Sequence, residues 1–384
     1  MTVEGTCDDP FGAVRAAFEA NFAPTEEAMF DEGAAVAVTV DGELVVDLWG
    51  GTATFDDGLT APWQRDTIVN AWSTTKTVSA LACLTLIDRG DLDPYAPVAR
   101  YWPEFAAAGK GDVEVRHVMS HTSGLSGWEQ PVTMDDFYDW EKVTSLLAAQ
   151  APWWEPGTAS GYHVISKGFL EGELVRRVTG QTTGQFLAEH IAGPLGAEFH
   201  IGTGAEHDRR IARIIPSPPR STEGLDPATV AVRTLDNPPL DASKAFEIPW
   251  RRAQVPAANG HGNARGLALL HAPMACGGAL NGVELVSPRT IDVALDVQCD
   301  GVDLVLGIPM RHGIGFALSV AGAPAGPNPR TFFWGGWGGS MGLIDVDARM
   351  SFGFLMNKMG AGTVGDLRAG RLLRAVYDSL ARRG

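Results

Sequence analysis

A serine and a lysine stand three residues apart in STTK, residues 73–76, and this is the only S-x-x-K pattern in the chain. They open an apolar run that reaches Arg89 and is followed by Gly90, which predicts a buried helix with a glycine cap. On a helix, this spacing places both side chains on one face. A serine hydroxyl becomes a good nucleophile when a base takes its proton, and a buried lysine can be that base because desolvation lowers its pKa. We therefore predict that Ser73 is a nucleophile and Lys76 its base; the alternative is that Ser73 only caps the helix.

A tyrosine follows a turn-like segment in the middle of the chain, within GYHV at 161–164. The apolar pattern predicts a helix from Val164 to Val178, so Tyr162 would stand at its entrance. From there its hydroxyl can project into a cleft and relay a proton for a serine nucleophile. The alternative is a packing role in the core. For the adjacent His163, a supporting role in the site and a packing role are equally open.

A glycine-rich segment, WGGWGGS at 334–340, follows the strand-like RTFF. Glycines let a substrate lie against the backbone, where an N–H group can point at a developing oxyanion. A bulged edge strand is the alternative interpretation. The segment also holds a G-x-S-x-G pattern around Ser340, which is typical of the nucleophile of α/β-hydrolases. We reject that fold because it needs a histidine after the serine, and the last histidine of the chain is His312.

Tryptophans near these motifs could form the walls of a substrate pocket, since aromatic side chains suit an uncharged ligand. The alternative is ordinary core packing, and for Trp128, Trp153 and Trp154 the two roles are equally open. The candidate substrate-binding residues are Trp128, Trp153, Trp154, Trp334 with Gly335 and Gly336, and Trp337.

Taken together, STTK at 73–76, YHV at 162–164 and WGG at 334–336 resemble the three motifs of family VIII carboxylesterases. Those esterases are similar to class C β-lactamases and penicillin-binding DD-peptidases, and the resemblance runs from about residue 30 to about residue 380. It implies that Ser73 attacks the carbonyl of an ester while Lys76 and Tyr162 handle its proton. It also implies an oxyanion hole made by the backbone N–H groups of Ser73 and Trp337, and an acyl-enzyme that water hydrolyses.

Two positions depart from the lactamase pattern. Val164 stands where the lactamases usually have asparagine, and Trp334 stands where they usually have the lysine or histidine of the third motif. Without that cation the carboxylate of a β-lactam would lack a partner, so we expect uncharged esters with short acyl chains as substrates. Arg265 could partly restore the missing charge. The alternatives are a β-lactamase, a D-amino-acid peptidase or amidase, an acyltransferase, or a non-catalytic binding module of the same fold.

The elements that would carry these motifs predict a fold in which both ends of the chain meet. Two β-rich runs flank Asp41 and Gly42, a pair typical of a hairpin turn, and strand patterns return from about Gly313. Between them the pattern is mainly helical. We therefore predict an α/β (α+β) fold, with one antiparallel sheet built from residues 1–90 and 287–384, flanking helices, and an inserted helical domain at 91–286. The resemblance implies the same β-lactamase/DD-peptidase-like architecture.

Composition limits the partners of the protein. The formal net charge of −16 disfavours nucleic acids and anionic membranes. The sequence has no membrane-length apolar run, no secretion signal and no cysteine spacing typical of metal ligands, so we expect free thiols and a cytoplasmic location. His117 and His121 lie four residues apart but lack the glutamate of a zinc motif, so we expect no metal and no cofactor. The expected partner is a small-molecule ester, and the sequence does not indicate an oligomeric state.

Overall fold

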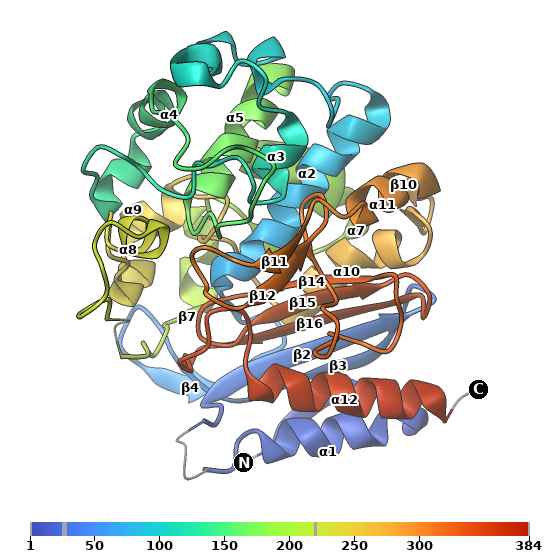
Figure 1. Ribbon diagram of the computed structural model, residues 1–384. Helices are drawn as coiled ribbons and strands as arrows, with labels where there is room; N and C mark the ends of the chain where they lie inside the picture. The colour runs from blue at the N-terminus through green and yellow to red at the C-terminus, as the bar shows by residue number, and fades with distance from the viewer. Residues whose placement is uncertain (1, 25–28, 219–220, 383–384) are drawn as a thin grey trace.

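The computed structural model describes residues 2–24, 29–218 and 221–382 of the chain. Its centre is an antiparallel sheet of ten strands to which both ends of the chain contribute (Figure 1), so the predicted fold class is confirmed. Nine strands follow the order β1-β3-β2-β16-β15-β14-β13-β12-β11, and β4 pairs with β3. The ten strands are β1 (Val3–Cys7), β2 (Gly33–Val40), β3 (Glu43–Thr54), β4 (Thr60–Pro62), β11 (Cys299–Val302), β12 (Pro309–His312), β13 (Ala317–Leu318), β14 (Thr331–Gly335), β15 (Met341–Asp345) and β16 (Met350–Met356).

The hairpin of β2 and β3 forms where the sequence predicts it. β2 and β3 pair around Asp41 and Gly42, whose φ angles of 52° and 82° lie in the left-handed region. Toward the other end of the chain, β15 and β16 pair around a turn in which Arg349 has a φ of 50°. The strand pattern over residues 314–320 is reduced to β13, because Gly315 takes a φ of 98° that interrupts the extended run.

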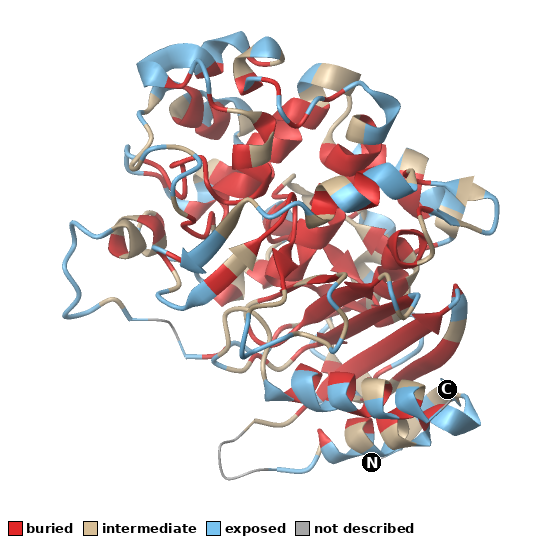
Figure 2. Cartoon of the chain, turned by 45° about the vertical axis from the view of Figure 1, so that its right-hand side comes forward, coloured by how far each residue is buried: buried red, intermediate tan, exposed pale blue. Residues whose placement is uncertain are grey.

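Helices cover both faces of the sheet (Figure 1). α1 (Gly12–Ala20) and α12 (Leu367–Ala381) pack against each other on one face, and α10 (Ala264–Ala275) packs on the other against β2, β15 and β16. Figure 2 shows the central strands between these layers as almost continuously buried. α10 lies inside the range 91–286 that we assigned to a separate helical domain, yet it packs on the sheet. The domain boundaries remain a prediction, and the packing of α10 favours a second boundary before residue 264.

The other helices gather around α2 (Thr75–Arg89), which runs through the interior of the molecule. Its first twelve residues, Thr75 to Leu86, are all buried, and Gly90 ends the helix with a φ of 77° as predicted. α2 packs against α5 (Ser166–Thr179), α6 (Thr183–Leu187) and α11 (Pro288–Leu295). None of the helices in the described part of the chain is long and apolar enough to span a membrane.

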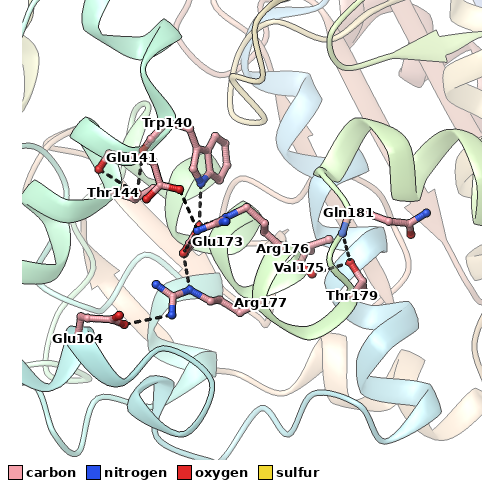
Figure 3. A network of polar contacts seen from close by, with 10 residues as sticks. All are labelled: Glu104, Trp140, Glu141, Thr144, Glu173, Val175, Arg176, Arg177, Thr179 and Gln181. Atoms are coloured by element: carbon pink, nitrogen blue, oxygen red, sulfur yellow. Dashed lines mark hydrogen bonds and ion pairs between the residues drawn. The ribbon is translucent and has the colours of Figure 1, made fainter.

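A polar network fixes α5 to α4 (Trp140–Ala149), and Figure 3 shows Glu173 at its centre. The carboxylate of Glu173 accepts hydrogen bonds from Trp140 Nε1 at 2.7 Å, Arg176 Nε at 2.8 Å and Arg177 Nε at 2.6 Å. Arg177 also pairs with Glu104 at 3.2 Å. The Glu173 side chain is buried, and a buried carboxylate is stable when such partners surround it. The network therefore holds the outer side of the helix that follows the second motif.

A small four-stranded sheet leads the chain to the first motif. Its strands, in spatial order, are β6 (Phe199–His200), β8 (His261–Gly262), β5 (Ile68–Asn70) and β7 (Ile211–Ala212). β5 pairs antiparallel with β8 and parallel with β7. Because β5 is held on both sides and ends just before the S-x-x-K motif, it fixes the direction from which the chain enters the site.

Candidate active site

Ser73 lies where strand β5 passes into helix α2. Trp72, Ser73 and Thr74 form a short 3-10 turn between the two elements. Trp72 takes a φ of 47°, a left-handed conformation that is uncommon for a bulky residue. Its indole packs against those of Trp250 and Trp337, with ring centroids 5.7 and 5.1 Å away. This packing holds the strained residue, and with it Ser73, at the N-terminal end of α2.

Lys76 lies one helical turn after Ser73 and is almost completely buried. Its Nζ atom is 3.1 Å from Ser73 Oγ, 3.0 Å from Tyr162 Oη, 2.7 Å from Val164 O and 3.0 Å from Ala257 O. Two of these neighbours are carbonyl oxygens, which can only accept hydrogen bonds. A neutral amine has two N–H groups for the two carbonyls and one lone pair left for a hydroxyl proton. The surroundings of Lys76 therefore suit a base that receives the proton of Ser73.

The charges around Lys76 also favour the neutral amine. Burial lowers the pKa of Lys76 well below its ordinary value, and the positive charge of Lys167 lowers it further. Glu171 acts in the opposite direction, but it forms a buried ion pair with Lys167 and accepts a 3.1 Å hydrogen bond from Ser79. Among the described residues no carboxylate pairs with Lys76 itself. The amine can therefore lose its proton without leaving a buried anion unpaired.

Tyr162 completes the arrangement around Ser73. Its hydroxyl donates a 2.6 Å hydrogen bond to Ser73 Oγ and lies 3.0 Å from Lys76 Nζ. Burial raises the pKa of Tyr162, so the phenol keeps its proton in the resting site. The prediction that Tyr162 stands at the entrance of a helix is wrong, because α5 begins only at Ser166. Residues 161–165 are irregular, so other elements must hold the phenol in place.

Aromatic rings pack behind the phenol. The ring of His121 lies 5.2 Å from that of Tyr162, and the ring of Trp334 lies 5.1 Å from it. His121 Nδ1 accepts a 2.9 Å hydrogen bond from the backbone N–H of His163. Burial lowers the pKa of His121 well below its ordinary value and that of His163 to about 3, so both rings are neutral near pH 7. This wall restricts the movement of the Tyr162 ring.

The third motif is held against the first by Ser340. Strand β14 ends at Gly335, and the glycine-rich segment then turns back into β15. Ser340 Oγ donates a 2.8 Å hydrogen bond to Ala71 O and lies 2.9 Å from Thr74 Oγ1, while Gly336 N donates to Ser340 O at 2.8 Å. A strand, β15, follows Ser340 where an α/β-hydrolase would have a helix, so the structure also differs from that fold at this serine. The serine of the G-x-S-x-G pattern therefore joins the two motifs.

A cavity of about 130 Å³ opens beside Ser73. Of the predicted site residues, Ser73, Tyr162, Trp128 and Trp337 line it. The rest of the wall comes mainly from residues 164–165 and 234–240. In the part of the chain that the structure describes, this lining contains one carboxylate, Asp236, and no lysine or arginine. The cavity can therefore hold a small, mainly apolar group against the hydroxyl of Ser73.

Three predicted substrate-binding residues lie outside this lining. The ring of Trp153 lies 4.1 Å from the guanidinium carbon of Arg233. Trp154 donates from Nε1 to Ala159 O at 2.9 Å. Both ring nitrogens of His163 are hydrogen-bonded to neighbouring protein groups. These contacts fit the packing alternative for all three residues.

Arg265 does not reach the cavity either. Its Nη1 atom pairs at 3.1 Å with Asp47 Oδ2, an oxygen that Arg65 also contacts at 3.4 Å, so the guanidinium is held at strand β3. Trp334 is buried behind Tyr162 and does not belong to the cavity lining. Neither side chain therefore offers a cation to a substrate carboxylate in the cavity.

Gly335 and Gly336 provide close packing of the third motif. A Cβ atom at Gly335 would lie 2.3 Å from Gly365 N, and one at Gly336 would lie 2.1 Å from Ser340 Oγ. Only glycine leaves room for this approach. A direct contact of these two residues with substrate stays a prediction.

Sequence reasoning missed the loop that forms one wall of the cavity. The side chain of Asn237 donates a 2.7 Å hydrogen bond to Trp128 O and accepts one of 2.9 Å from Val132 N. Nearby, the hydroxyls of Ser126 and Thr234 are 2.7 Å apart. The proline-rich NPPL at 237–240 identifies a loop, but nothing in its composition indicates the surface on which the loop packs.

One group of described residues has the composition of a metal site. Glu198, His200 and His207 each offer a ligand atom, and these atoms lie within 4.8 Å of one another. The guanidinium of Arg210 already donates to Glu198 at 2.5 Å and lies 2.7 Å from His207 Nδ1. The group is not part of the cavity lining beside Ser73. The group is therefore separate from the site around Ser73.

Comparisons of the sequence with known proteins identify relatives of this chain. Residues 22–376 match the family model for Beta-lactamase. The chain is 34% identical over 372 residues to esterase/beta-lactamase LipL of Mycobacterium tuberculosis, covering 93% of this chain and 83% of that protein. It is 29% identical over 236 residues to esterase EstB of Burkholderia gladioli, covering 54% of this chain and 59% of that protein.

Solved structures extend the similarity to the whole fold. A family VIII carboxylesterase aligns with a TM-score of 0.90 and 42% identity, covering 99% of this chain and 100% of that one. EstA from Arthrobacter nitroguajacolicus Rue61a aligns with a TM-score of 0.88 and 28% identity, covering 100% of both chains. Matched over nearly its full length in sequence and in structure, the chain belongs to the beta-lactamase family.

Proposed function

We propose that this protein is a serine esterase that hydrolyses uncharged carboxylic esters with short acyl chains through an acyl-enzyme on Ser73. One observation carries the proposal: Ser73 Oγ lies 3.1 Å from Lys76 Nζ and 2.6 Å from Tyr162 Oη at the wall of a mainly apolar cavity. The similarity to a family VIII carboxylesterase and to the esterases LipL and EstB supports ester hydrolysis as the reaction.

Acylation begins with the hydroxyl of Ser73. Its Oγ attacks the carbonyl carbon of the ester while its proton passes to the lone pair of Lys76. The backbone N–H groups of Ser73 and Trp337 stabilise the oxyanion that forms. Tyr162 then gives its proton to the leaving alkoxide, and the Lys76 ammonium returns a proton to the phenolate. The alcohol departs, and the acyl group remains bonded to Ser73.

Deacylation runs the same proton path in reverse. A water molecule takes the place of the alcohol and loses a proton to the Lys76 and Tyr162 pair as it attacks the acyl carbonyl. The bond to Ser73 Oγ breaks, and the serine recovers a proton from the same pair. The carboxylic acid leaves as product, and each group ends in its starting protonation state.

The cavity lining supports a preference for uncharged substrates. Among the lining residues that the structure describes, a substrate carboxylate would meet the carboxylate of Asp236 and no basic residue. Leaving such a charge without a partner in a partly dry site is costly. The oxygens of Asp236 already accept hydrogen bonds from Thr222 at 2.8 and 2.7 Å, which keeps this carboxylate in the wall. The cavity volume of about 130 Å³ supports short acyl chains.

The substrate preference is tested by comparing kcat/KM for p-nitrophenyl acetate and butyrate with that for nitrocefin. We expect the ester to be preferred by at least about tenfold, which is ~1.4 kcal/mol of transition-state binding. A p-nitrophenyl decanoate arm checks the limit on acyl length. Equal or faster turnover of nitrocefin would favour a β-lactamase, the second activity in the name of LipL.

The nucleophile is tested by intact-mass spectrometry after treatment with a fluorophosphonate. We expect a single adduct that maps to Ser73, and none in Ser73→Ala. An adduct on Ser340, or full esterase activity in Ser73→Ala, would disprove the mechanism.

A further inference from the structure

Tyr162 reaches Ser73 from an irregular segment, so its position depends on contacts from elsewhere in the fold. The turn between β11 and β12 supplies two of them. Leu304 N donates a 2.8 Å hydrogen bond to Ser160 O, and Asp303 Oδ1 accepts a 3.0 Å hydrogen bond from Tyr162 N. These bonds attach the segment that carries the phenol to the outer strands of the ten-stranded sheet.

Asp303 is completely buried, and its two carboxylate oxygens have different surroundings. Oδ1 also accepts the N–H groups of Val305 and Leu306, each at 2.9 Å. Oδ2 has no hydrogen-bond partner among the described residues and lies 3.7 Å from His312 Nε2. Burial alone would raise the pKa of Asp303, but His312 and the N–H groups outweigh it and lower the pKa to about 2. A full negative charge is therefore held behind Tyr162, although Oδ1 alone would be enough to form the turn.

The charged and titratable groups that face Tyr162 come from several elements. The His312 ring lies 5.2 Å from His121, whose own ring lies 5.2 Å from Tyr162, so the carboxylate and the rings form one continuous layer. Burial raises the pKa of Tyr162, and the charge of Asp303 raises it further. The groups are Lys76 of α2, His121 after α3 (Val115–Met119), His163 beside Tyr162 itself, and Asp303 and His312 of the β11–β12 hairpin.

We propose that Asp303 is a positioning residue for Tyr162. It fixes the backbone of the segment at 160–162 so that the phenol meets Ser73 and Lys76. This role rests on the proposed function, in which Tyr162 is the acid of the acylation step.

The proposal is tested by comparing Asp303→Ala, which removes the acceptor of the three N–H groups, with Asp303→Asn, whose amide oxygen can still accept them. We expect Asp303→Ala to lower kcat for p-nitrophenyl butyrate about tenfold with a smaller change in KM, because the phenol of Tyr162 no longer meets Ser73 and Lys76. Asp303→Asn should restore most of this kcat, since the hydrogen bond to the Tyr162 backbone is kept.

Asp345→Ala is the matched control. Asp345 is equally buried in the same sheet, and it accepts hydrogen bonds from Ala348 N at 2.9 Å, Asn328 Nδ2 at 2.9 Å and Tyr377 Oη at 2.8 Å. Its replacement should lower thermal stability but leave kcat and KM per folded molecule in place, since it does not belong to the site.

If Asp303→Ala does not fold, Asp303→Glu keeps the charge but moves the acceptor by one methylene group, and it should lower kcat in the same way. An unchanged kcat per folded molecule in Asp303→Ala, or in Asp303→Glu when Asp303→Ala does not fold, would overturn the positioning role. Ser73→Ala in the same assays separates the two ideas. Esterase activity in Ser73→Ala would overturn the proposed function, whereas loss of activity there beside an unaffected Asp303→Ala would overturn only the inference.

Discussion

Lys76 and Lys110 are both buried, but their side-chain nitrogen atoms have different neighbours. Lys110 is completely buried after the 3-10 helix at Pro103–Gly109, and its Nζ atom donates to three carbonyl oxygens: Ala107 O at 2.7 Å, Ala148 O at 2.9 Å and Gln150 O. Three carbonyls match the three N–H groups of an ammonium ion. Two of them lie at the C-terminal end of α4, where a positive charge is favoured. Lys110 is therefore held as a structural cation.

Lys76 has two carbonyls and two hydroxyls around its Nζ atom. Carbonyl oxygens accept hydrogen bonds but do not exchange protons at neutral pH, whereas the hydroxyls of Ser73 and Tyr162 can give a proton and take one back. Neither Lys76 nor Lys110 has a carboxylate partner among the described residues. Lys110, a structural cation, and Lys76, the proposed base, therefore differ in the kind of oxygen atoms that surround the side-chain nitrogen.

The largest expected effect is a difference in kcat between variants of Lys76 and of Lys110. Lys76→Met and Tyr162→Phe should each lower kcat for p-nitrophenyl butyrate by about 10²-fold or more, because each removes part of one proton path. The double variant should be little slower than either single variant, since residues that act as a unit lose activity non-additively. Lys110→Met, assayed per folded molecule, should keep the wild-type kcat. If Lys110→Met lowered kcat as much as Lys76→Met, the distinction between the two lysines would be wrong. If the fold losses of kcat multiplied in the double variant, Lys76 and Tyr162 would not act on the same proton path.

The second prediction concerns pH. In the proposed mechanism the active form of Lys76 is the neutral amine, so kcat/KM should rise with pH as Lys76 loses its proton. Burial lowers the pKa of Lys76, so this rise should occur well below pH 10.5. Lys76→Arg keeps the charge and cannot release a proton, and it should be inactive across the range. A kcat/KM that falls through neutral pH would show that the ammonium is the active form.

The smallest effect concerns stability and should be common to both positions. Lys110→Met leaves Ala148 O and Gln150 O without the ammonium donor, while Ala107 O keeps a 3.3 Å hydrogen bond from the backbone N–H of residue 110, and Lys76→Met leaves two carbonyls without a donor. Each variant should lose about 1–3 kcal/mol in free energy of unfolding, measured with urea. An unchanged unfolding midpoint in Lys110→Met would show that water replaces the ammonium at no penalty.

The stability contributed by Lys110 also depends on pH. Burial lowers its pKa in the folded protein to about 8, from an ordinary value of 10.5. Between these two pKa values the unfolded chain binds more protons than the folded protein does. The stability that Lys110 contributes therefore falls as pH decreases from about 10.5 to about 8. The stability gap between wild type and Lys110→Met should therefore be wider at pH 10 than at pH 8. If the stability gap were narrower at pH 10 than at pH 8, the carbonyl oxygens would stabilise the ammonium ion more than burial destabilises it.

The features that could be predicted from the sequence depend on a few neighbouring residues. The spacing of Ser73 and Lys76 fits one helical turn, and Asp41 with Gly42 fits one tight turn. The antiparallel sheet followed from strand patterns at both ends of the chain. These predictions needed only local geometry and the alternation of apolar residues.

The rest depends on contacts between distant segments. A single lysine in sequence does not show whether it will be buried, so Lys110 carried no signal. Asp303 lies 141 residues from Tyr162 along the chain and meets it only through the β11–β12 turn. Arg265 was a reasonable candidate for a substrate cation until its partner Asp47, from β3, was known. The roles of Ser73, Lys76, Tyr162 and Trp337 stay predictions until they are tested.

The backbone at Trp72 has a consequence for laboratory evolution of this enzyme. Its left-handed conformation favours glycine or asparagine, yet an indole fills the space beside Trp250 and Trp337. Selection for a wider pocket would enrich small residues at position 72, which relax the backbone and enlarge the cavity together. The same changes remove the ring that supports Trp337, so variants with a broader substrate range should lose turnover number. Second-round mutations that restore it should cluster at positions 250 and 337, where the lost packing can be rebuilt.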